Sequence, residues 1–223
     1  MKLTVFNGSG RGKHGNTAVL VDAYVRGFTS LPGNTAEIHT LMQTSKMDQF
    51  TAAFAEAEHV LLAFPLYTDM VPGVVKAFLE TLQPFCGRPG NPSITYLAQC
   101  GFPEGVQLRA LEAYLEKLSR RLGCRHVGII LRPSSEGIRE TSGKNLSALL
   151  NQFEQFGKKF GATGQLDAEK LAALPQPERL PGWVVVLFKV FGFTGLLDSG
   201  WKSDLKKNHA YQDRFARPDL DNQ

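Results

Sequence analysis

Four glycines and several hydrogen-bonding side chains lie close together near the start of the chain, in the segment NGSGRGKHGNT. The residues before it are apolar and those after it have helical periodicity, which predicts a strand, a loop and a helix. A loop of this kind presents free backbone N–H groups and the positive end of a helix dipole, and both favour a phosphate. Ser9, Asn16 and Thr17 can add hydrogen bonds, and Arg11 can add positive charge. These four residues are candidates for binding a terminal phosphate.

A dinucleotide site is the alternative interpretation of the same loop. The spacing Gly-x-Gly-x-x-Gly occurs from Gly10 onward, but alone it is a weak signal. A dinucleotide fingerprint also needs an acidic residue at the end of the second strand, whereas Glu37 lies inside the segment 35–41. No Gly-Lys-Ser/Thr follows the loop, which excludes a P-loop. The pattern therefore favours a phosphomonoester and leaves the dinucleotide as the weaker alternative.

Strand and helix patterns alternate along most of the chain. Strands are predicted at 2–6, 35–41, 59–64, 93–99 and 126–132, and helices at 16–28, 47–57 (capped near Ser45), 71–82, 104–123 and 142–160. Five such units predict a doubly wound α/β domain with a parallel sheet and helices on both faces. Ligands of such sheets bind outside the carboxyl ends of the strands. The loops to inspect are therefore 7–16, 65–71, 99–105 and 133–141.

Charge, cysteine content and apolar stretches exclude several classes of partner and site. The net charge of +4 is mild and spread along the chain, so we expect no nucleic-acid partner. Three widely spaced cysteines form no CxxC, which indicates no disulfide framework, no metal site and a reducing cytoplasm. The N-terminal apolar run is too short for a signal peptide. The longest apolar stretch, 183–197, contains Lys189 and is too short to span a bilayer.

Three loops carry a resemblance to a known family. NGSGRGKHGNTAVLV resembles the Gly-Ser-Pro-Arg…Gly-Asn-Thr phosphate loop of the flavodoxin-like NAD(P)H-dependent FMN reductases, with Gly10 in place of the proline. FPLYTDMVPGVVKAFLE (64–80) is similar to the Pro-Leu-Tyr…Pro-Gly segment of the same family, and AQCGFPEG (98–105) to its third flavin loop. The resemblance covers residues 2–160 and implies a flavodoxin-like sheet of order 2-1-3-4-5. It also implies that Ser9, Arg11, Asn16 and Thr17 hold the phosphate of FMN.

The resemblance also implies where the flavin ring would bind. A planar ring needs an apolar surface, which Pro65, Leu66 and Tyr67 can provide, and backbone donors at its polar edge. The amides of Tyr67, Thr68 and Asp69 are the expected donors. In the third loop, Gly101 would allow close backbone approach and Phe102 could flank the ring.

The implied activity is hydride transfer from NADPH or NADH, through flavin N5, to a quinone, an azo or nitro compound or a flavin. The flavin carries that chemistry, so no catalytic side chain is assigned. A flavodoxin-type electron carrier is the second possibility, although such carriers are usually acidic and this chain has a pI near 9. No cysteine cluster separates the second and third strands, so an iron–sulfur cluster is not expected.

The end of the chain departs from the alternating pattern. We expect an FMN-binding domain at 1–162 and a C-terminal helical extension at 163–223. The apolar stretch 183–197 is interpreted first as packing on the core; a dimer interface or a membrane-facing surface are the alternatives. The expected partners are a small-molecule electron acceptor and a second copy of the chain, with no nucleic acid and no membrane.

Overall fold

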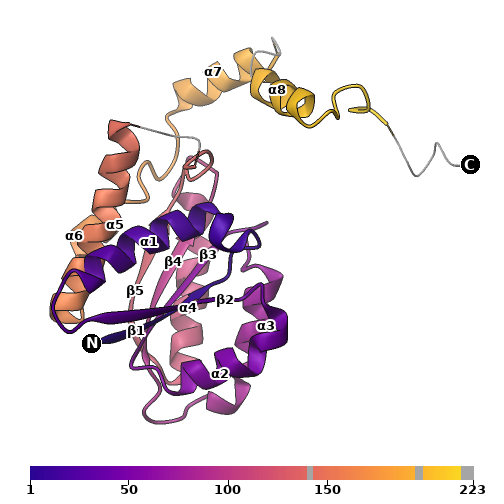
Figure 1. The fold of residues 1–223 in the computed structure, drawn as a ribbon. Helices are drawn as coiled ribbons and strands as arrows, with labels where there is room; N and C mark the ends of the chain where they lie inside the picture. The colour runs from indigo at the N-terminus through magenta and orange to yellow at the C-terminus, as the bar shows by residue number, and fades with distance from the viewer. Residues whose placement is uncertain (140–142, 194–197, 217–223) are drawn as a thin grey trace, which may run out of the picture. The chain divides into compact units, whose positions relative to one another are not determined.

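The computed structural model describes residues 1–139, 143–193 and 198–216. Five parallel strands form one sheet in the order β2-β1-β3-β4-β5 (Figure 1). The strands are β1 (Lys2–Asn7), β2 (Thr35–Thr40), β3 (His59–Pro65), β4 (Ser93–Gln99) and β5 (Arg125–Arg132). The helices between and after them are α1 (Asn16–Thr29), α2 (Met47–Ala55), α3 (Gly73–Thr81), α4 (Val106–Leu122), α5 (Lys144–Thr163) and α6 (Ala168–Ala173). This is the flavodoxin-like order, and the predicted fold class is confirmed.

Two apolar cores cover the two faces of the sheet. On one face, residues of β1 and β3 pack against α1 and α5, with Tyr24, Phe153 and Phe156 fully buried. On the other face, α2, α3 and α4 bury Phe54, Phe78 and similar side chains. β3 is buried along its whole length because it is central and covered on both faces, which explains its continuous apolar sequence.

Helix starts differ slightly from the predicted ones. A 3-10 turn at Thr44–Lys46 precedes α2, and the N-cap is Lys46 with no side-chain cap hydrogen bond. The cap predicted near Ser45 is therefore wrong, because Ser45 lies inside that turn. Helix α3 begins at Gly73 and not at residue 71, since Pro72 is its N-cap in an extended conformation. The predicted start of the fifth helix at 142 lies outside the described residues, and α5 itself extends to Thr163.

The chain divides by its contacts into two units, Met1–Arg179 and Leu180–Gln223. The first unit contains the sheet, and α6 packs beside the edge strand β5. The second unit contains α7 (Gly182–Phe193) and α8 (Ser199–Lys207). Helix α7 carries most of the apolar stretch 183–197, whose residues 194–197 lie outside the described part. No helix of the described residues is long and apolar enough to cross a membrane.

Candidate flavin site

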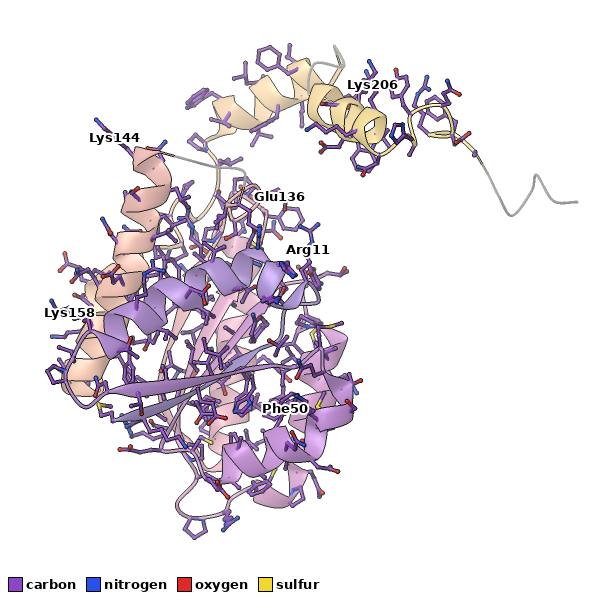
Figure 2. The ribbon with its side chains drawn as sticks, viewed as in Figure 1. Arg11, Phe50, Glu136, Lys144, Lys158 and Lys206 are labelled. Carbon is purple, nitrogen blue, oxygen red and sulfur yellow. The ribbon has the colours of Figure 1, made fainter. Side chains whose placement is uncertain are left out.

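A pocket of about 140 Å³ opens at the carboxyl ends of β1, β3 and β4. Seven of the predicted site residues line it: Ser9, Arg11, Asn16, Pro65, Leu66, Tyr67 and Gly101. Four further lining residues were not among the predicted ones: Gly15, Gln99, Cys100 and Glu136. Figure 2 labels the two charged members, Arg11 and Glu136. The pocket brings together four loops that are far apart in the sequence, including the loop after β5 that contains Glu136, as the rule for parallel sheets predicts.

The first loop is shaped by Asn7, the last residue of β1. Its Oδ1 accepts a hydrogen bond from the Ser9 amide at 3.0 Å, and its Nδ2 donates to the Gly12 carbonyl at 3.3 Å. The Gly12 amide donates to the Ser9 carbonyl at 2.8 Å, and Gly12 has the left-handed φ of +53° that favours glycine. A buried asparagine thus fixes the loop, leaving Ser9 buried and Arg11 exposed.

Asn16 and Thr17 form the first turn of α1. The Asn16 side chain donates to the Ser135 carbonyl at 2.7 Å, and the buried Thr17 hydroxyl accepts from Gln99 at 3.2 Å. Both side chains therefore hold neighbouring loops in place. Their backbone amides find no acceptor within the described chain, as is usual for the start of a helix. Those two N–H groups and the helix dipole leave a site suited to an anion.

The second loop is a two-residue turn from Tyr67 to Met70. The amides of Tyr67 and Met70 donate to each other's carbonyl oxygens, both at 3.1 Å. Thr68 and Asp69 have φ of +48° and +63°, left-handed values that cost a non-glycine residue about 1–3 kcal/mol each. The Tyr67 amide is thus used inside the turn, whereas the Thr68 and Asp69 amides donate to no acceptor within the described residues.

Only some residues of this loop line the pocket. Tyr67 is 51% exposed and lines the pocket, and Leu66 is buried in the pocket wall. Neither Thr68 nor Asp69 lines the pocket, so the contact of their amides with a ring stays a prediction. The turn presents an aromatic surface and two free N–H groups together.

The third loop is tied to the end of β5. The Cys100 amide donates to the Arg132 carbonyl at 3.0 Å, and its carbonyl accepts from the Ser135 amide at 2.8 Å. A Cβ on Gly101 would lie 2.9 Å from Oε2 of Glu136, so glycine lets that carboxylate approach the loop. Phe102 is 56% exposed and does not line the pocket.

Cys100 lies in the wall of the pocket. Burial raises the pKa of the Cys100 thiol, which keeps it protonated at neutral pH. Cys86, Cys100 and Cys124 are all free thiols. Among the described residues, no cluster of His, Cys, Asp and Glu side chains is arranged to hold a metal ion. What the pocket offers is cationic charge, backbone donors, an aromatic face and the Glu136 carboxylate.

Comparison with known proteins identifies solved structures with the same fold. No family model and no curated protein matches the sequence. The structure resembles an azoreductase from Bacillus anthracis (TM-score 0.56, 16% identity, 72% of this chain and 100% of that one). It also resembles the NADH:FMN oxidoreductase EmoB (0.55, 16%, 82% and 98%) and the NAD(P)H:quinone oxidoreductase of Methanothermobacter marburgensis (0.55, 12%, 72% and 96%). At these identities the likeness establishes the flavodoxin-like fold.

Proposed function

We propose that this chain is an FMN-dependent oxidoreductase that passes hydride from NADH or NADPH to a small-molecule acceptor. The acceptor would be a quinone, an azo or nitro compound or a flavin. The observation that carries the proposal is the turn at Tyr67–Met70, where two left-handed residues leave backbone donors free beside an exposed ring. Strained conformations of this kind persist where the surrounding structure holds them for a function.

The first loop fits the phosphate of FMN. Two free amides at the start of α1 and the Arg11 guanidinium supply donors and charge for a dianion. The Ser9 hydroxyl accepts from the Arg11 amide at 3.3 Å, and its O–H remains a possible donor to the phosphate. Asn16 would act chiefly through its backbone amide, since its side-chain NH₂ already donates to the Ser135 carbonyl.

The second and third loops fit the ring. Pro65, Leu66 and Tyr67 give an apolar and aromatic wall, and the Thr68 and Asp69 amides are free donors for a polar ring edge. The pocket is smaller than the roughly 300–1,000 Å³ typical of small-molecule sites, so a flavin would be enclosed only in part. A ring with one open face can meet a nicotinamide nucleotide and then an acceptor at the same place.

Bound FMN would supply hydride acceptance and donation at N5. The residues of this chain would bind the phosphate, orient the ring and donate hydrogen bonds to its polar edge. No side chain is assigned a proton-transfer role.

The structural neighbours support an oxidoreductase reaction of this class. The structures reported above are named as an azoreductase and as NADH:FMN and NAD(P)H:quinone oxidoreductases. An electron carrier that binds FMN without reacting with nicotinamide nucleotides is the second candidate. The same turn would serve it equally well, so only the reaction with the nucleotide separates the two functions.

The visible spectrum of the purified protein, reconstituted with FMN, tests the proposal. We expect flavin bands that are bleached by NADH or NADPH in the absence of oxygen, with the faster nucleotide identifying the physiological donor. Bound FMN that neither nucleotide reduces would assign the electron-carrier function. Failure to bind FMN would contradict both.

The Arg11→Gln substitution tests the phosphate site separately. Losing one charge-assisted contact should raise the Kd for FMN about tenfold or more. Riboflavin, which lacks the phosphate, should bind the variant and the wild type equally. Lys13→Gln is the matched control, because Lys13 is an exposed cation of the same loop that does not line the pocket. Equal effects of the two substitutions, or an equal loss of riboflavin binding, would contradict a contact between Arg11 and the phosphate.

A further inference from the structure

A second cavity, of about 420 Å³, lies at the carboxyl end of β5 between that strand and helices α5 and α6. It shares no lining residue with the candidate flavin pocket. Its volume falls within the roughly 300–1,000 Å³ that small-molecule sites occupy. Its polar lining residues are Arg132, Asn151, Gln152, Gln155, Lys170 and Gln176.

Arg132 is the last residue of β5, and its side chain has no partner among the described residues. Side chains alternate along a strand, so Arg132 shares the face of Ile130, which packs with α1 and α5, and not that of Leu131. Its Nε is buried without a hydrogen bond, and its guanidinium forms no ion pair or hydrogen bond with the described residues. Burial lowers the pKa of Arg132, as desolvation of a cation does. A charge held in this way is costly unless something else pairs with it.

The rest of the lining matches an anion. Lys170 adds a second cation, and its ion pair with Asp167 is weak enough to exchange, because the two charged atoms are 3.7 Å apart and the lysine is exposed while the aspartate is half-buried. The other polar lining residues are carboxamides, which donate and accept hydrogen bonds without charge. Among the residues that the structure describes, no Asp or Glu lines the cavity. Phe156 and Leu174 supply apolar surface beside these groups.

We infer that this cavity binds a small molecule bearing an oxyanion group, a carboxylate or a phosphate. The planar guanidinium of Arg132 would pair with the oxyanion, Lys170 would add charge, and the carboxamides would bind the polar remainder of the molecule. The inference does not rest on the proposed flavin chemistry, because no flavin-site residue takes part.

The backbone links this cavity to the flavin pocket. The Arg132 carbonyl accepts hydrogen bonds from the Cys100 amide at 3.0 Å and from the Ser135 hydroxyl at 3.1 Å. The Ser135 carbonyl in turn accepts from Asn16 in the phosphate loop. The two sites are therefore joined through the ends of adjacent strands.

Thermal unfolding of the full chain in rising concentrations of inorganic phosphate or sodium succinate, at constant ionic strength set with sodium chloride, tests the inference. We expect at least one of the two anions to raise the Tm saturably, since a ligand that binds only the folded state stabilises it. The more effective anion identifies the oxyanion. No saturable shift with either anion would overturn the inference.

Arg132→Met keeps the length of the side chain and removes its charge. The variant should weaken the apparent affinity about tenfold or more, and its Tm without anion should equal or exceed that of the wild type. Arg125→Met is the matched control, because Arg125 is an exposed cation at the opposite end of β5 and should leave anion binding unchanged. An unchanged anion response in Arg132→Met, or a large fall in its Tm without anion, would assign Arg132 a structural role and overturn the inference.

Discussion

His59 and His126 lie on β3 and β5, at the amino ends of the strands. Burial lowers the pKa of both imidazoles, and for His59 this outweighs the nearby Glu58 carboxylate, 3.2 Å from Nε2. Their pKa in the folded protein is thus below the unfolded value of about 6.5. Between the folded pKa and about pH 6.5, the unfolded chain binds more protons than the folded one. The contribution of the two histidines to the free energy of unfolding is therefore fully present above about pH 6.5 and is lost as the pH falls through the folded pKa.

Thermal unfolding at a series of pH values from 8 to about 5 measures this effect. The Tm should fall across the acid half of the range, and His59→Asn with His126→Gln should flatten the decline. Asparagine is chosen at position 59 because its amide can replace Nδ1 in the hydrogen bond with Ser93. A decline as steep in the double variant as in the wild type would assign it to other groups.

Some residues of the candidate site could be predicted from the sequence alone, and others could not. The position of Ser9 and Arg11 in the pocket was predictable, because the loop between a strand and the following helix lies at the carboxyl edge of the sheet. Gln99 and Glu136 were not, because each enters the pocket from a loop or strand end whose distance from the glycine loop depends on the whole sheet. Asn7 carries a signal in the sequence, because it is a polar residue at the end of a largely apolar strand.

At the scale of elements, α1 and α5 pack unusually closely through two glycines. A Cβ on Gly27 would lie 1.8 Å from the carbonyl oxygen of Glu154, and one on Gly157 would lie 1.9 Å from that of Tyr24. Backbone atoms cannot move aside as a flexible side chain can. Gly27→Ala or Gly157→Ala should therefore lower the free energy of unfolding by about 1–3 kcal/mol or more, measured with urea.

Gly73→Ala is the control for these substitutions. Gly73 begins α3, and nothing lies within 4 Å of its Cβ position, so alanine there should be neutral or stabilising by up to about 1 kcal/mol. Equal effects at positions 27, 157 and 73 would show that intrinsic helix propensity, and not the close contact, determines the outcome.

Periodicity predicted the strands and helices well, because each pattern is local and the central strands are continuously apolar. Periodicity could not predict which helices contact each other, so it gave no sign that Gly27 lies at the close contact between α1 and α5. It also could not predict the left-handed Thr68 and Asp69, since neither residue type requires that conformation. These features arise from tertiary packing, which overrides local preference.

At the scale of the whole molecule, helix α7 of the second unit carries exposed apolar side chains. Trp183, Val186, Leu187 and Val190 follow the i, i+3, i+4, i+7 spacing of one face of α7, and all four are exposed. A second copy of the chain is an expected partner from the sequence, and we propose this face as the interface of that homodimer. Light scattering should then give twice the 24.5 kDa mass of one chain.

Removing residues 180–223 tests how far the flavin site depends on the second unit. Every residue assigned to the site lies in Met1–Arg179, which has its own sheet and two cores. The shortened chain should therefore fold and bind FMN with a Kd within about threefold of the full chain, a difference below about 0.7 kcal/mol. Fluorescence quenching of FMN measures the affinity, and circular dichroism checks the fold. A folded, shortened chain that has lost FMN would show that the second unit, from the same chain or a partner copy, completes the site.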